Sequence, residues 1–231
     1  MISASVKLLL IEGFMLVPAF VFTMTLRGFA RAWMSKREGD VFPEECGFLT
    51  LDPAAHVNIF AAMFVAVIFT IIDYIAPVSP TSSSTLFVTL MLLGPNWVSR
   101  IDLDPYRFDK PSRGVLRVFY FGIGVMLFAA LMAFYASRIM VKLSVPEFIL
   151  EPLSIFFIEF AVCCIWFPLI NLIPLPSLDG EVLLSYFFPA TREYTEQITP
   201  FIGIAIIMLI LPVLRVVMMA IMLLLSNLVF I

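Results

Sequence analysis

The chain has few charged residues. Only 13% of its 231 residues are charged and 62% are hydrophobic, whereas ordinary soluble domains are about a quarter charged and about half apolar. The mean hydropathy is +1.06. This balance excludes a soluble globular domain and indicates an integral membrane protein. The net charge of -3 is small, so nothing in the composition points to a nucleic-acid partner.

Residues that hold metals or form disulfides are also scarce. His56 is the single histidine, Cys163 and Cys164 are neighbours in an apolar run, and Cys46 stands alone. This pattern indicates neither a disulfide framework nor a zinc knuckle. Neighbouring residues on a helix point in different directions, so the cysteine pair is also poorly placed for a rebuilt metal site. We therefore interpret His56 as a hydrogen-bonded loop residue and the cysteine pair as helix packing, and we expect no cofactor.

Long apolar runs are plentiful, and they predict the fold class. We expect an all-α polytopic membrane protein with about five transmembrane helices in a single domain over residues 1–231. Residues 86–93 are apolar but too short to cross a membrane alone, and they form a re-entrant, interfacial or extended segment. The last run is one long helix or two pieces broken at Pro212. The five runs are residues 7–33, 54–76, 115–140, 155–173 and 200–231.

Basic residues predict the orientation. Lys36 and Arg37 follow the first run, and five more basic residues lie before and at the start of the third. Cytoplasmic loops of membrane proteins are enriched in lysine and arginine, so both stretches should face the cytoplasm. This requires the second run together with residues 86–93 to enter the membrane and return. The five residues around the start of the third run are Arg100, Arg107, Lys110, Arg113 and Arg117.

The most unusual stretch is residues 171–180, NLIPLPSLDG, in which Asp179 follows a proline-broken hydrophobic segment. Pro174 and Pro176 free backbone groups that must find partners inside the protein. A carboxylate in or near the hydrocarbon is costly unless it is paired or bound to a metal. Asp179 therefore needs a partner.

The spacing Asn-x-x-Pro-x-x-x-Leu-Asp-Gly in this stretch resembles the signature of the site-2 protease family of intramembrane zinc metalloproteases. It is formed by Asn171, Pro174, Leu178, Asp179 and Gly180. Further stretches resemble the small bacterial members of the family in the same order, so the likeness covers nearly the whole chain. It implies a site-2 protease-like core in the inner membrane of a bacterium. The supporting stretches are residues 25–33, 37–40, 49–56, 96–106, 110–114 and 189–194.

The positions that carry the family's chemistry are replaced in this chain. In the family, a His-Glu-x-x-His helix supplies two zinc ligands and a water-activating glutamate, and the aspartate of Leu-Asp-Gly is the third ligand. Here the histidine positions are Arg27 and Arg31, the glutamate position is Gly28, and only Asp179 remains. A guanidinium has no lone pair for a metal, and glycine cannot act as a base. The family's Gly-Pro-x-x-Asn also reads GIGVM at residues 122–126, so the resemblance implies an inactive member without a metal.

The replacement suggests a structural hypothesis for the charged residues. Without a metal, Asp179 is an uncompensated anion, and Arg27 with Arg31 returns positive charge to the same place. Arginine and carboxylate side chains can satisfy each other through paired hydrogen bonds. We therefore expect an Arg27/Arg31–Asp179 ion cluster that clamps the first span to the fourth. The alternative is that both arginines extend to the cytoplasmic surface, because they lie near the end of their helix.

Three further charged residues fall at membrane depth. Glu12 and Glu159 are either relays for protons or ions, or polar contacts with a partner subunit, or residues near the headgroups. Glu159 lies close to the expected start of the fourth span, which favours the headgroup interpretation. Arg215 lies deeper, and we expect it to meet an acidic residue of a partner or a lipid phosphate.

These observations favour a zinc-free pseudoprotease over an enzyme. We expect a structural or binding subunit of a membrane complex, whose partners are the lipid bilayer and other membrane proteins or a transmembrane helix. A residual metalloprotease with an altered site is one alternative. A subunit that conducts ions or protons along a polar path of Glu12, Glu159 and the arginines is the other.

Overall fold

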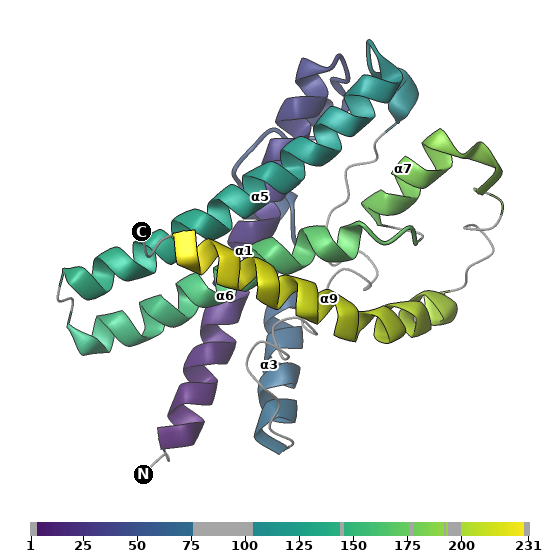
Figure 1. Cartoon of the computed structure of the whole chain (residues 1–231). Coiled ribbons are helices and arrows are strands. Elements are labelled where there is room, and N and C mark those ends of the chain that lie inside the picture. Colours follow the sequence, from purple (N-terminus) through teal and green to yellow (C-terminus); the bar gives the residue numbers. More distant parts are fainter. Residues whose placement is uncertain are drawn as a thin grey trace.

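The computed structural model describes residues 4–75, 104–143, 146–175, 178–191, 193 and 200–228. In these ranges the chain is helical and contains no β-strand (Figure 1). The expected segment at residues 86–93, together with Arg100, lies outside them. The helices are α1 (Ala4–Arg37), α2 (Phe42–Glu45), α3 (Ile59–Ile75), α5 (Pro111–Lys142), α6 (Glu147–Asn171), α7 (Asp179–Phe187) and α9 (Pro200–Leu228), with 3-10 turns at η1 (Pro53–Ala55), η2 (Pro105–Arg107) and η3 (Pro189–Thr191).

Four of the described helices are long and apolar enough to cross a membrane. Their spans are Ile11–Arg37, Pro111–Lys142, Glu147–Asn171 and Leu209–Leu228. The 17 residues of α3 measure about 26 Å, which is less than the ~30 Å of a hydrocarbon core. The prediction of an all-helical, polytopic membrane protein is therefore confirmed. The expected number of spans was about five, and the described residues supply four.

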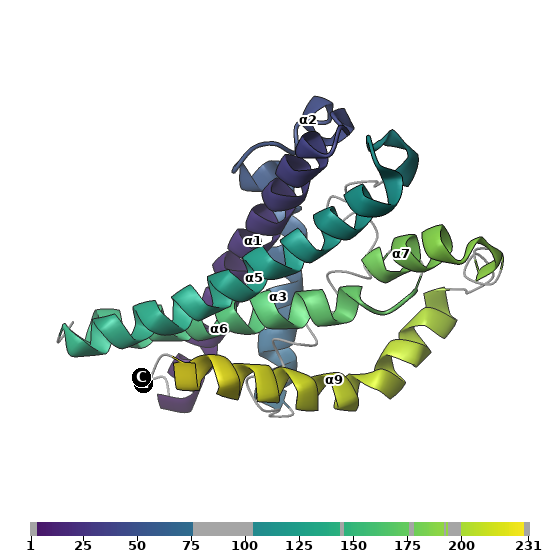
Figure 2. The same cartoon turned by 45° about the horizontal axis from the view of Figure 1, so that its top comes forward.

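Prolines and glycines explain where the helix boundaries differ from the expected ones. Gly39 has a φ of 103°, a conformation that favours glycine, and α1 continues past the expected end of the first run to Arg37, two residues before this glycine. α6 begins at Glu147 rather than near residue 155, because Pro152 is accommodated inside the helix. α9 likewise runs through Pro212 as one helix, and it is visibly bent in Figure 2, as a missing backbone donor explains.

α1 organises the packing, and it contacts α6, α5 and α3. Figure 1 shows α5 and α6 side by side as an antiparallel pair, which α1 crosses, while α3 runs beside α1. Phe20, Met126 and Trp166 come from α1, α5 and α6 and are fully buried in one hydrophobic cluster. The candidate site lies next to this cluster, so the helices that carry its side chains are held in place by the hydrophobic core.

The end of α1 and the start of α5 lie together at one end of the molecule (Figure 2). Nη1 of Arg117 donates to Oε1 of Glu38 at 2.7 Å, and the backbone N–H of Asp109 donates to the carbonyl of Glu38 at 2.9 Å. The basic residues in the last turn of α1 and those described just before and at the start of α5 therefore share one end, as the predicted orientation requires. Which side of the membrane that end faces stays a prediction.

Candidate functional site

Asp179 is the first residue of a separate short helix. α6 ends at Asn171, and α7 begins at Asp179. The expected clamp between the first and fourth spans is therefore wrong in one respect, because the carboxylate belongs to α7. Two prolines between the helices explain the break, since neither can donate a backbone hydrogen bond that would continue α6.

Gly180 allows α7 to begin directly against the end of α6. A Cβ added at this glycine would lie 2.6 Å from the carbonyl oxygens of both Leu172 and Ile173. Backbone atoms cannot move aside as a flexible side chain does, so this close approach requires glycine. Among the other residues of the motif, Leu178 is buried and Pro174 is exposed. The Leu-Asp-Gly motif thus positions the Asp179 carboxylate through the backbone.

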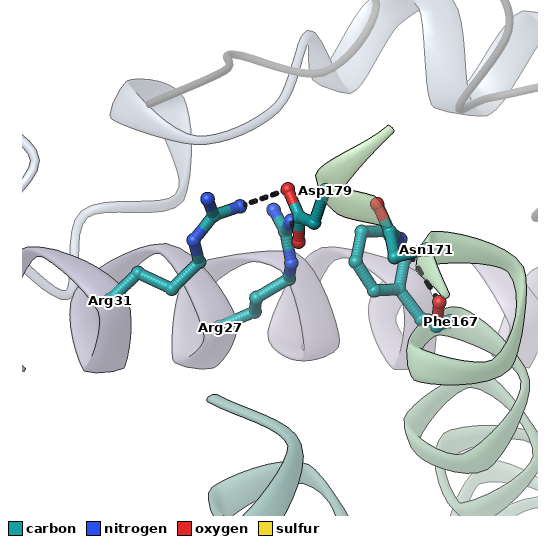
Figure 3. A network of polar contacts seen from close by, with 5 residues as sticks. All are labelled: Arg27, Arg31, Phe167, Asn171 and Asp179. Atoms are coloured by element: carbon teal, nitrogen blue, oxygen red, sulfur yellow. Dashed lines mark hydrogen bonds and ion pairs between the residues drawn. The ribbon is translucent and has the colours of Figure 1, made fainter. Parts of the chain in front are cut away.

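Arg27 and Arg31 converge on this carboxylate from α1 (Figure 3). Nη2 of Arg27 donates to Oδ2 of Asp179 at 2.5 Å, and Nη1 of Arg31 donates to Oδ1 at 2.7 Å. A spacing of four residues places the two arginines on one helix face, so each oxygen receives one guanidinium. The expected contacts are present. The alternative in which the arginines extend to the surface is wrong, because their side chains are only 11% and 6% exposed.

α6 supports the cluster from the side. The guanidinium carbon of Arg27 lies 4.3 Å from the centroid of the Phe167 ring, a cation–π arrangement. Nδ2 of Asn171 donates to the carbonyl of Phe167 at 2.9 Å, one helical turn earlier (Figure 3). The side chain of Asn171 therefore supplies a hydrogen-bond donor to a carbonyl in the last turn of α6. The cluster consequently links α1 and α7 and rests on α6.

The charges of the cluster set the protonation state of Asp179. Burial acts to raise the pKa of its carboxyl, but the charges and hydrogen bonds of Arg27 and Arg31 outweigh burial and hold that pKa below its ordinary 3.8. Asp179 is therefore ionised at neutral pH and accepts both guanidinium hydrogen bonds as a charged partner.

His56 occupies the space beside Gly28. A Cβ added at this glycine would lie 2.1 Å from Nδ1 and 2.6 Å from Cε1 of the histidine ring. Nε2 of His56 lies 2.8 Å from the carbonyl oxygen of Thr50, an acceptor, so Nε2 carries the proton. The prediction of a hydrogen-bonded loop residue is confirmed. Its packing against α1 was not anticipated, and a glycine inside an apolar helix was the only signal for it.

A small cavity adjoins the ion cluster. Its volume is about 20 Å³, and besides the three charged side chains its lining includes Gly122, Met126 and Asn171. This is room for about one water molecule. The structure therefore brings Gly122 and Met126 of α5 beside the ion cluster.

The residues of this site do not fit a zinc ion. Both oxygens of Asp179 accept hydrogen bonds from guanidinium groups, which carry positive charge and offer no lone pair. Among the described residues, no three His, Cys, Asp or Glu side chains converge on one point. Zinc sites in proteins require at least three such ligands.

The remaining candidate residues lie elsewhere in the fold. Glu159 is in the middle of α6 and 5% exposed, so placing it near the headgroups was wrong: the earlier start of α6 puts it deeper. Glu12 is half-buried on α1. Cys163 and Cys164 are fully buried, which confirms their interpretation as packing residues. Arg215 is on α9, away from the ion cluster.

No family model, curated protein or solved structure matches the chain. The likeness to site-2 proteases therefore rests on the motifs quoted from the sequence and stays a prediction.

Proposed function

We propose that the chain is a zinc-free, catalytically inactive relative of site-2 proteases that serves as a structural or binding subunit of a membrane complex. The observation that carries this proposal is the double hydrogen bond from Arg27 and Arg31 to Asp179. The cluster holds three segments together at the position where the family resemblance places a metal. The guanidinium groups thus take the structural role of a metal cation but do not supply its catalytic chemistry.

Three features of the site argue against hydrolysis. The position of the water-activating glutamate is Gly28, and the ring of His56 fills the space that a side chain there would need. Met126 lines the cavity where the resemblance implies an asparagine that polarises the substrate carbonyl. The cavity beside the cluster is also small, at about 20 Å³, which is room for about one water molecule.

The binding role is supported by what the fold keeps. The helices still form a packed core, and α5 and α9 leave most of their span surfaces uncovered, with 33% and 17% buried against 61% for α6. Such surfaces contact either lipid or other membrane proteins. In a membrane, association between helices depends on close packing and polar contacts rather than on apolar burial.

The test uses the full chain expressed in its membrane with an affinity tag. Extraction in mild detergent should yield a stoichiometric complex with at least one other membrane protein, and the purified chain should not cleave transmembrane peptide substrates with or without a chelator. A monomer without partners would contradict the binding role. Cleavage that a chelator abolishes and Asp179→Ala removes would contradict the inactive assignment.

A further inference from the structure

A single arginine lies inside the last helix. Arg215 is the one charged residue of α9, which runs from Pro200 to Leu228. At 1.5 Å per residue it lies about 22 Å from the start of α9 and about 20 Å from its end. A guanidinium at this depth is in the hydrocarbon, where an unpaired charge is costly.

Arg215 is half-buried, and its guanidinium lies at the surface of the protein. Its Nε atom is covered by protein and has no hydrogen-bond partner among the described residues. The two Nη atoms are not among the buried atoms, so they are the donors that a group outside the chain can reach. A cation held at this place in the helix is costly until an acceptor pairs with it.

Arg215 lies at the edge of an uncovered helix face. One turn away on one side are Leu211 and Met218, which are buried against the rest of the protein. One turn away on the other side are Pro212 and Met219, which are exposed. Residues three and four positions apart are neighbours on a helix surface, so the guanidinium borders both faces. Figure 2 shows α9 on the outside of the helix group, alongside α6.

We propose that this face of α9 docks a transmembrane helix of another protein that carries an aspartate or glutamate at the depth of Arg215. The face consists of Pro212, Arg215, Val216, Met219 and Leu223. The apolar residues alone give no preference for protein over lipid, since lipid tails cover them equally well. The cation supplies the preference, because a carboxylate pairs with it and completes its hydrogen bonding. This inference rests on the proposed binding role and names its surface and partner.

Two other occupants fit less well. A second copy that pairs through α9 would bring the two Arg215 side chains together, because the helix contains no acidic residue and a two-fold contact places like residues near each other. A lipid phosphate lies at the headgroups, whereas Arg215 lies near the middle of α9. The charge and its depth therefore favour an acidic side chain on a partner helix.

The experiment uses the full chain in phosphatidylcholine liposomes and fluorescent synthetic peptides. Each peptide is a leucine–alanine transmembrane helix that differs only at its central residue, which is glutamate, glutamine or leucine. By energy transfer, the glutamate peptide should bind about tenfold more tightly than the leucine peptide, with glutamine between them. Arg215→Leu should abolish the difference, and Arg215→Glu should transfer the preference to a peptide with a central lysine.

Arg113→Leu is the matched control, because it removes one positive charge from an exposed position on α5 and should leave the peptide preference unchanged. Equal binding of all peptides by the wild-type chain would overturn the proposal. Self-association that Arg215→Leu abolishes would assign the face to a second copy, and dependence on added phosphatidylglycerol without a peptide preference would assign it to lipid. None of these outcomes depends on the ion cluster, so they can be distinguished from a finding that the chain is an active protease.

Discussion

The imidazole of His56 lies against Gly28, so close that a Cβ on the glycine would be 2.1 Å from Nδ1. The two residues are joined in space but lie on different segments, a loop and the helix α1. Because the ring also contacts the carbonyl of Thr50 at 2.8 Å, it is held from both sides. Position 28 is thus part of a packed contact that leaves no room for a larger side chain.

Gly28→Ala should therefore destabilise the protein, by about 1–3 kcal/mol, because the new methyl group overlaps the imidazole. The free energy of unfolding in bicelles measures the effect. Gly124→Ala is the matched control, since a Cβ at that α5 glycine meets nothing within 4 Å, and alanine there should stabilise by up to about 1 kcal/mol.

A double-mutant cycle tests the cause. Gly28→Ala combined with His56→Ala should cost less than the sum of the two single changes, because the smaller residue leaves room for the methyl group. Strict additivity would show that the two side chains do not meet.

Asp179→Asn should destabilise the protein by about 3 kcal/mol, because it leaves two buried guanidinium groups without their counter-charge. Asp104→Asn is the control, as that carboxylate is 47% exposed and its loss should change little. Replacing all three charges together, as Arg27→Met, Arg31→Met and Asp179→Leu, should restore much of the loss. An Asp179→Asn variant that is as stable as the wild type would contradict the clamp.

The clamp should be insensitive to pH across the physiological range. The folded-state pKa of Asp179 is lowered from 3.8 by the two arginines, so its stabilising contribution is fully present above pH 3.8. It is lost only as the pH falls through the lower folded-state value. The difference in thermal stability between wild type and Asp179→Asn should therefore be constant from pH 8 to pH 5 and should shrink below pH 3.8. A difference that already shrinks near pH 6 would contradict this protonation state.

Much of the fold follows from apolar runs and helix-ending residues. The runs located the four spans found among the described residues. Prolines were the main source of error. The predicted fourth span begins at residue 155, after Pro152, whereas α6 begins at Glu147 and contains this proline. The predicted depth of Glu159 was therefore too shallow. A proline near a helix end removes few hydrogen bonds, and sequence alone does not tell whether the helix begins before or after it.

The charged residues of the ion cluster could be predicted from the sequence, but the contacts that hold them in place could not. The spacing of Arg27 and Arg31 places them on one face, and the family motif connects that face to Asp179. Nothing local to either segment shows that the carboxylate begins its own helix, or that Gly180 is needed because two carbonyls lie 2.6 Å from its missing Cβ. The contact between His56 and Gly28 was likewise hidden, because it joins a loop to a helix through space and has no periodic signature.

The zinc content of the purified chain, measured by mass spectrometry after exposure to zinc and dialysis, distinguishes an ion cluster from a metal site. The wild-type chain should retain well below one zinc per chain. The variant Arg27→His with Arg31→His should gain zinc, because two imidazoles and the Asp179 carboxylate then supply three ligands, and a further Asp179→Ala should abolish the gain. About one zinc per wild-type chain, lost on Asp179→Ala, would contradict the replacement of a metal by the two arginines.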